Sequence, residues 1–446
     1  MDKFKQLEQW LTNSTEKEIP KAIISSNLKV IDLPQLGRCI VAAKDLNTHE
    51  SIITIPHTFM LNYITILMHF KKWNPSLPFS ESLAHSAIYL PDYSHFKDTF
   101  GNFYRSLTEE EILSLNSFQL ISMYIILEKR RATDSFWKPF IDVLPVLEEL
   151  RNIPFTWIIN KSQTEDEIFQ LLPPDIKTHS IEQLQKFEQD YKGVSNLIDK
   201  HSQYNTKDAL YISKDEFLWA WLCCNSRCLY MELPKKLKKT VEDNFTLVPF
   251  VDFINHISDD SCTTTISHKQ GYMVSTGTVK YKENDQIFFT YGSHSDNFLI
   301  MEYGFMLPTC SNKSNYLDMT HIINKLLNQQ QIEFLKENHY FELHYATKEE
   351  ISFTTEIALA TLQDFKDGNC SRSLRGFIDG TYDGAKYTEN NKLLIKKIIA
   401  KLSRNTDNQL EKIKQIRLEI PKSEYFKLDV LETIYLNMKE IEKCHL

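Results

Sequence analysis

The stretch LVPFVDFINHISDD, residues 247–260, joins an apolar run to an abruptly polar end. Seven of its first eight residues are apolar or proline, and the run then reaches Asn255 and His256. A buried polar group without a partner costs about 1–3 kcal/mol, so a buried element excludes such a pair unless both side chains find partners. The stretch therefore predicts either a plain exit to the surface or a site at which something is bound.

Length and composition indicate a globular protein with more than one domain. The chain has 446 residues, 42% hydrophobic and 25% charged, and a single core rarely grows beyond about 250–300 residues. The net charge is −8 and no long basic tract is present, so we expect no nucleic-acid partner. Because the N-terminus is charged and no window approaches 18 apolar residues, we expect no signal peptide and no membrane association.

Cysteine and glycine usage adds two constraints. The eight cysteines lie at scattered positions without the paired C-x-x-C spacing of a zinc site, so we expect free thiols, no metal centre, and a cytosolic or nuclear location. Only 11 glycines occur, where average usage gives roughly 30. Each glycine therefore carries more positional information than usual, and Gly37, Gly292 and Gly304 all fall in the motifs described below.

Short β-like segments flank a long helical block. Residues 3–12 predict a helix, and the segments LKVIDL, RCIVAAKDL and ESIITIP between residues 28 and 56 predict strands. The pattern is helical from about 58 to 240 and β-like again at 246–310, where residues 271–292 hold two candidate strands joined by a polar turn. From 320 onward it is helical again. Since interrupted β regions usually meet in space, we expect the helical block to be an insertion.

Several motifs stand in one order along the chain: LGRCIVAAKDL (36–46), NSRCLY (225–230), FINH (253–256) and FFTYGSHSDNFLIMEYGF (288–305). Together they resemble the SET-domain protein methyltransferases of the Rubisco large-subunit methyltransferase class, most like the SET domain-containing protein four group. The resemblance implies an α+β fold, with an N-terminal helix at 1–22 and a SET β-fold at 23–310 split by a helical insertion at about 100–245. A helical C-terminal substrate-binding domain is implied at 311–446.

The resemblance also implies a site for S-adenosyl-L-methionine. Asn255 and His256 match the pair that contacts the adenine and methionine ends of this cofactor, which explains why the apolar run ends on two polar residues. Arg227 matches a cation placed against the cofactor carboxylate, for which a planar guanidinium is suited. Asp252 is expected to orient Asn255 or a neighbouring backbone group.

The turn at residues 37–39 departs from the family pattern. Gly37, Arg38 and Cys39 match the turn whose backbone approaches the amino-acid end of the cofactor, where the family commonly reads Gly-x-Gly. Cys39 replaces the second glycine, and a side chain there is expected to narrow the approach.

Two tyrosines match the catalytic positions of the family. Tyr291 corresponds to the catalytic tyrosine, which also contacts the cofactor, and Tyr303 to a second aromatic residue of the lysine channel. Methyl transfer from a sulfonium to an amine is an in-line displacement that needs a neutral amine in a fixed position. The Tyr291 hydroxyl can accept a hydrogen bond from that amine.

The resemblance implies a protein-lysine N-methyltransferase, acting as a monomer on a lysine-bearing, non-histone protein of the ribosomal or translation-factor type. Two alternatives stay open. A protein-histidine methyltransferase is one, although the histidine-directed group lacks the tyrosine that matches Tyr303. A catalytically inactive SET-fold binding protein is the other, because of Cys39.

Overall fold

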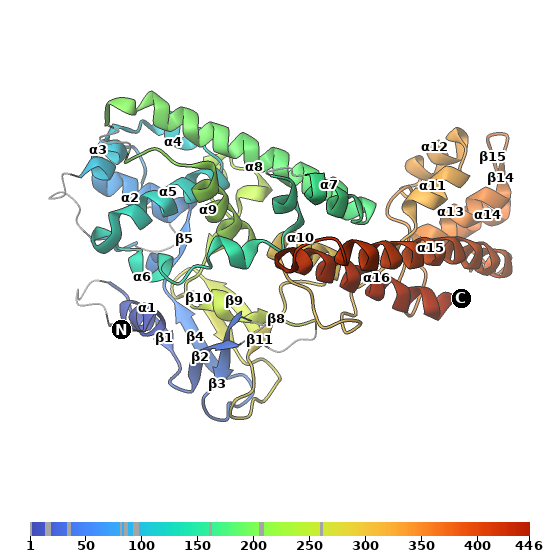
Figure 1. Cartoon of the computed structure of the whole chain (residues 1–446), viewed down its shortest axis with the longest axis horizontal. Coiled ribbons are helices and arrows are strands. Elements are labelled where there is room, and N and C mark those ends of the chain that lie inside the picture. Colours follow the sequence, from blue (N-terminus) through green and yellow to red (C-terminus); the bar gives the residue numbers. More distant parts are fainter. Residues whose placement is uncertain are drawn as a thin grey trace. The chain divides into compact units, whose positions relative to one another are not determined.

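The computed structural model describes residues 2–13, 19–33, 37–80, 83, 88–91, 98–159, 163–204, 209–258 and 262–446. Two compact units make up the chain. The first comprises residues 1–159, 178–292 and 301–304, and the second comprises residues 160–177, 293–300 and 305–446. Figure 1 shows strands β1–β4 and β8–β11 in the first unit, and the long helices α15 and α16 with the short hairpin β14–β15 in the second. Helices and short strands together give the predicted α+β class.

The main sheet of the first unit combines two strands that precede the helical block with two strands that follow it. Its order is β1 (Ile23–Ile24), β4 (Ser51–Ile55), β10 (Gly271–Ser275) and β9 (Thr263–Ser267). All neighbours are antiparallel, and Ile55 lies opposite Tyr272. β4 and β10 pair directly, although the helical block separates them along the sequence. The block therefore connects two strands that are neighbours in the sheet. β2 (Leu28–Leu33) and β3 (Gly37–Ala42) form a separate antiparallel pair in the predicted positions.

The two strands predicted within residues 271–292 exist but do not pair with each other. Both edges of β10 are occupied, by β4 and β9, so β11 (Phe288–Phe289) has no free edge there. It pairs instead with β8 (Asn255–His256), and this pairing is parallel. A third small sheet has the order β5 (Leu61–Asn62), β7 (Phe245–Leu247), β6 (Cys228–Tyr230).

Helices α1–α5 and α9 of the first unit begin at side-chain caps that the sequence provides. Ser213 caps α9, and its hydroxyl and the Glu216 carboxylate form the predicted capping box. The helices lying wholly in this unit are α1 (Lys3–Thr12), α2 (Tyr63–Trp73), α3 (Thr99–Ser106), α4 (Glu109–Ser114), α5 (Ser117–Arg131), α6 (Lys138–Ile141) and α9 (Lys214–Arg227). α8 (Pro174–Lys200) begins in the second unit and continues through the first.

The second unit is mainly helical and has its own hydrophobic core. Ile357, Ile395, Ile399 and Ile441 belong to that core. Its helices are α7 (Gln163–Gln170), α11 (Thr320–Leu326), α12 (Gln329–Glu337), α13 (Phe353–Asp364), α14 (Arg372–Ile378), α15 (Thr388–Arg417) and α16 (Tyr425–His445). Two short hairpins complete the unit, β12 (Leu317–Asp318) with β13 (Tyr345–Ala346) and β14 (Phe365–Lys366) with β15 (Asn369–Cys370). Among the described residues, none of the helices combines the length and apolar character that a bilayer span requires.

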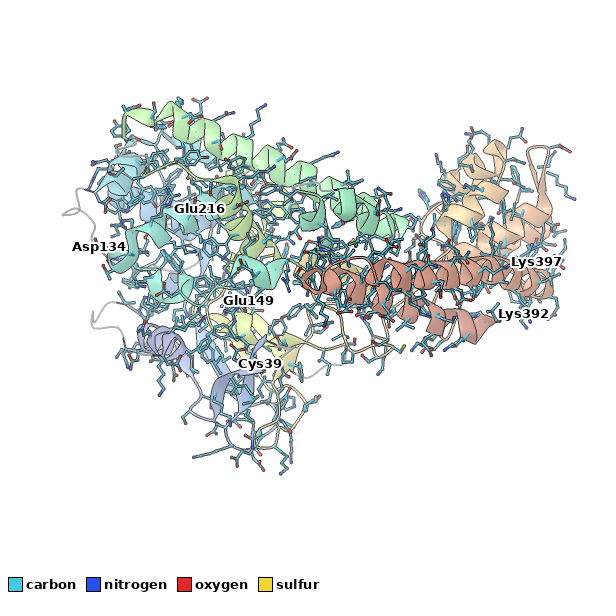
Figure 2. All side chains as sticks on the ribbon, viewed as in Figure 1. Cys39, Asp134, Glu149, Glu216, Lys392 and Lys397 are labelled. Atoms are coloured by element: carbon cyan, nitrogen blue, oxygen red, sulfur yellow. The ribbon has the colours of Figure 1, made fainter. Side chains whose placement is uncertain are left out.

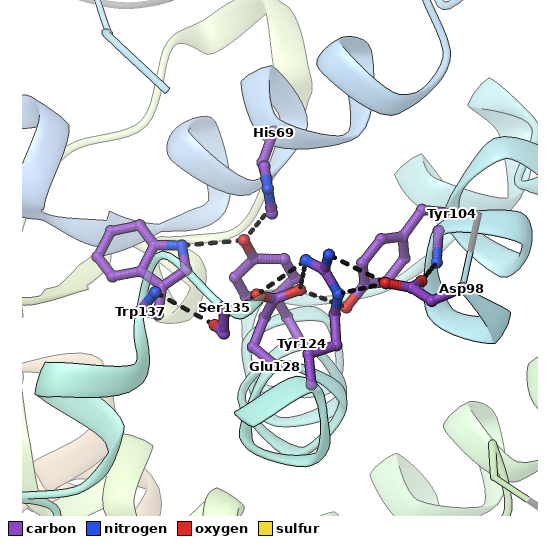
Figure 3. A network of polar contacts seen from close by, with 9 residues as sticks. His69, Asp98, Tyr104, Tyr124, Glu128, Ser135 and Trp137 are labelled. Carbon is purple, nitrogen blue, oxygen red and sulfur yellow. Dashed lines mark hydrogen bonds and ion pairs between the residues drawn. The ribbon is translucent and has the colours of Figure 1, made fainter. Parts of the chain in front are cut away.

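A buried polar network holds the helices of the first unit together (Figure 3). Glu128 is fully buried, and its carboxylate accepts hydrogen bonds from Ser135 Oγ (2.6 Å), Tyr104 Oη (3.1 Å) and Arg131 Nη1 (3.3 Å). The Arg131 guanidinium also contacts Asp98, at 3.1 Å. Burial raises the pKa of Glu128, and the positive charge of Arg131 opposes that rise. The Glu128 carboxylate thus accepts hydrogen bonds from α3, from α5 and from the turn that follows α5.

We expect Glu128→Ala to lower the free energy of unfolding of the first unit by about 3 kcal/mol. The substitution leaves the Arg131 guanidinium buried with only one of its two carboxylate partners, Asp98. All six tryptophans lie in the first unit, so tryptophan fluorescence during urea denaturation measures this change. Asp134→Ala is the matched control, since Asp134 is exposed (Figure 2), and its effect should stay within about 0.5 kcal/mol. Equal midpoints for the two variants would contradict this role of Glu128.

Candidate active site

The parallel pairing of β8 with β11 brings residues 254–256 beside residues 288–291. Asn255 lies opposite Phe288, and His256 lies opposite Phe289. Two further contacts extend the pairing to Tyr291. Its backbone N–H donates to His256 Nδ1 at 3.1 Å, and its hydroxyl donates to the Ile254 carbonyl oxygen at 2.9 Å. The apolar run of residues 247–254 therefore ends at a built polar site.

The Tyr291 hydroxyl is arranged to accept a hydrogen bond. Its proton is donated to the Ile254 carbonyl, and a phenol oxygen that donates its proton in this way can still act as an acceptor. Burial raises the pKa of Tyr291 well above its ordinary value, a rise that the positive charge of Arg227 opposes. The phenol thus stays protonated at neutral pH, a state in which it can act as a hydrogen-bond acceptor but not as a base.

Arg227 and Asp252 form an ion pair beside Tyr291. Arg227 is the last residue of α9, and its Nη1 donates to the backbone oxygen of Asp252 at 3.0 Å and to Oδ2 at 3.2 Å. The Asp252 side chain is 1% exposed and that of Arg227 is 19% exposed. Asp252 thus orients Arg227, whereas the expected partner was Asn255 or a nearby backbone group. Burial raises the pKa of Asp252, and the charges of Arg227 and Arg38 oppose this rise.

Residues 37–39, which were predicted to form a turn, are instead the first three residues of strand β3 and pair with β2. Gly37 is exposed with φ at +68°, and a Cβ atom there would meet nothing within 4 Å. The Arg38 side chain is buried and donates to the Val143 carbonyl and to Glu149 Oε2, the latter at 3.1 Å. Cys39 and Glu149 are labelled in Figure 2. Cys39 is fully buried, and burial raises the pKa of its thiol, so this side chain packs into the unit.

Tyr303 completes an aromatic pair with Tyr291. It is the last residue of α10 (Asp296–Tyr303), and residues 301–304 belong to the first unit. The two ring centroids lie 5.1 Å apart with 51° between the ring planes. Burial raises the pKa of Tyr303 well above its ordinary value. The structure thus brings both predicted catalytic tyrosines together, next to the strand that carries Asn255 and His256.

Sequence reasoning missed two groups of this site. The Ile254 carbonyl fixes the Tyr291 hydroxyl, and its position directly before Asn255 in the FINH motif was the available signal. Glu149 pairs with Arg38 across 111 positions of the chain. No local pattern connects these two residues, so the pairing was not predictable from the sequence.

Comparison with known proteins gives the class. Residues 37–292 match the family model of the SET domain, and residues 315–446 match that of the ribosomal lysine N-methyltransferase 2 C-terminal domain. Since the first match covers more than half of the chain, the chain belongs to the SET-domain family. The predictions of a SET fold, of S-adenosylmethionine as cofactor and of a protein-lysine N-methyltransferase are confirmed at this level.

Several curated proteins resemble the chain over most of its length. Ribosomal lysine N-methyltransferase 2 of Saccharomyces cerevisiae is 29% identical, over 96% of each chain. Ribosomal lysine N-methyltransferase set11 of Schizosaccharomyces pombe is 22% identical, over 89% of this chain and 87% of that protein. SET domain-containing protein 4 of Homo sapiens is 21% identical, over 76% and 67%.

A solved structure shows the same fold. The SET domain of LSMT bound to MeLysine and AdoHcy superposes with a TM-score of 0.52 at 15% identity, covering 99% of this chain and 90% of that one.

We expect Asn255→Ala to weaken the binding of S-adenosylhomocysteine, the demethylated cofactor, on the order of 10-fold, because a side chain with both a donor and an acceptor is lost. Calorimetric titration of the purified chain measures this change. Asn102→Ala, on the exposed surface of α3, is the control and should bind like the wild type. Unchanged affinity in Asn255→Ala would remove Asn255 from the cofactor site.

Tyr291→Phe should keep the affinity for S-adenosylhomocysteine and lower kcat on the order of 100-fold, because the amine loses the acceptor that fixes its position. Transfer of a labelled methyl group to protein measures kcat. Tyr211 is 59% exposed, so Tyr211→Phe is the matched control. A kcat equal to that of the wild type would exclude the Tyr291 hydroxyl from the reaction.

Proposed function

We propose that the chain methylates a lysine side chain of a ribosomal protein, in the cytosol or the nucleus. Two relatives that align over most of their length are ribosomal lysine N-methyltransferases by name. Residues 315–446, which lie within the second unit, match the C-terminal domain of that same group. Similarity therefore extends beyond the SET domain into the part that we predicted to bind substrate.

The charged residues of the site fit the amino-acid end of S-adenosylmethionine. Arg227 Nε and Asp252 Oδ1 are buried, and neither forms a hydrogen bond with a described residue. A guanidinium donor suits a carboxylate, and a carboxylate oxygen suits an ammonium. Arg227 and Asp252 would therefore hold the amino-acid end of the cofactor, with Gly37 at the exposed start of β3, and Asn255 and His256 would hold the rest. When bound, the cofactor supplies a methyl group on a sulfonium.

The tyrosines would prepare the lysine amine. A free lysine has a pKa of about 10.4, so its neutral form costs about 4–5 kcal/mol at pH 7. The rings of Tyr291 and Tyr303, 5.1 Å apart, give apolar walls that disfavour the ammonium and lower this cost. The observation that carries the proposal is the Tyr291 hydroxyl, which donates its proton to the Ile254 carbonyl and would therefore meet an amine as an acceptor.

Incubation of the purified chain with methyl-labelled S-adenosylmethionine and ribosomal proteins tests the target. We expect one labelled ribosomal protein, with methyl-lysine as the labelled residue after hydrolysis, and labelling on the order of 100-fold slower with Tyr291→Phe. Labelled methyl-histidine would assign the chain to the histidine-directed alternative. Absence of label from a chain that binds the cofactor would contradict the ribosomal target.

A further inference from the structure

Asn225, the first residue of the NSR motif, has no part in the site described so far. It lies on α9, two residues before Arg227. Its side-chain Nδ2 donates to the backbone oxygen of Glu302 at 2.8 Å and to Glu302 Oε2 at 2.9 Å. One amide group thus uses both of its protons to hold the residue that precedes Tyr303.

Helix α8 holds the same segment from a second direction. His179 Nε2 lies 2.5 Å from Glu302 Oε1, and Gln183 Nε2 donates to the backbone oxygen of Met301 at 3.2 Å. The carboxylate of Glu302 therefore bridges α9 and α8, one oxygen to each.

The chain after Tyr303 is restricted as well. Gly304 has φ at +78°, and a Cβ atom there would lie 3.1 Å from Ile153 Cγ1. A left-handed glycine ends the helix at this point, and the close side chain of Ile153 limits where the turn can move. Tyr303 is therefore held on both sides.

The end of α9 supports both halves of the site. Through Asn225 it fixes the segment that carries Tyr303, and through Arg227 it contacts Asp252 on the cofactor side. We propose that Asn225 and Glu302 form a clamp that positions Tyr303 against Tyr291 and so sets the geometry of the lysine channel. Both are positioning residues, because they act through Tyr303. The proposal rests on the proposed function, in which Tyr303 lines that channel.

Glu302 could act on Tyr303 by holding its position or by its negative charge, and the two roles predict different effects of substitution. The carboxylate lies close enough to Tyr303 to contribute to the raised pKa of that tyrosine, after burial, Cys228 and Tyr291. Glu302→Gln removes the charge but keeps an oxygen for Asn225 and a polar group for His179, whereas Glu302→Ala removes the bridge. If the clamp works by position, the glutamine variant rescues what the alanine variant loses.

The first test compares kcat, KM and cofactor affinity in the full chain, with methyl-labelled S-adenosylmethionine and ribosomal proteins. Asn225→Ala and Glu302→Ala should lower kcat at least 10-fold, while Glu302→Gln stays within twofold of the wild type. S-adenosylhomocysteine should bind all variants within twofold of the wild-type affinity. Glu242→Ala is the control, since that side chain is 78% exposed and forms one ion pair with Lys186.

Three results would overturn the clamp. An unchanged kcat in both alanine variants would show that Tyr303 needs no such support. A parallel loss of cofactor binding and of folding stability would make the role merely structural. A loss in Glu302→Gln as large as in Glu302→Ala would assign the effect to charge.

A second measurement does not depend on turnover. Amide hydrogen exchange of the peptide covering residues 301–304 should be at least 10-fold faster in Asn225→Ala than in the wild type, with residues 252–256 unchanged. If the wild type labels no protein, the proposed function fails, yet the clamp is still tested by this exchange. Equal exchange in the two chains would overturn it.

Discussion

The parallel pairing of two very short strands, β8 and β11, is the constraint on which the site depends. It sets Asn255 opposite Phe288 and His256 opposite Phe289, and this register places Tyr291 within reach of His256 and the Ile254 carbonyl. A shift by one residue would turn each of these side chains to the other face of its strand. The two added hydrogen bonds to Tyr291 lock the register that two residues per strand alone would hold weakly.

Buried charge is the second determinant of the site. Asp252 lies in the interior in direct contact with Arg227, while Arg38, held by Glu149, adds positive charge at longer range. The attraction within a buried ion pair offsets the cost of removing both charges from water only when the remaining donors and acceptors are also hydrogen-bonded. Here one carboxylate oxygen of Asp252 and one guanidinium nitrogen of Arg227 have no hydrogen-bond partner among the described residues. Such a pair is poorly stabilised as a structural element and well suited to a zwitterionic ligand.

Local patterns predicted the parts of the fold that depend on local chemistry. The strand at Leu28–Leu33, the helix at Lys3–Thr12 and the capping box at Ser213 were all found where expected. The motifs, recognised together in their order along the chain, identified residues that meet in the site, because each short motif could be recognised from neighbouring residues alone. Contacts between distant residues were not predictable. The Arg38–Glu149 pair and the Asn225–Glu302 contact depend on how helices of the insertion pack, which no periodicity records.

We propose that Arg227, Asp252, Asn255 and His256 form a working S-adenosylmethionine site, with Cys39 packed inside the unit. Calorimetric titration of the full chain with S-adenosylmethionine and, separately, with S-adenosylhomocysteine tests it most directly. Saturable binding of each ligand at one per chain is the predicted result. A folded chain that binds neither ligand would contradict the account and would favour a SET-fold protein that binds partners without catalysis.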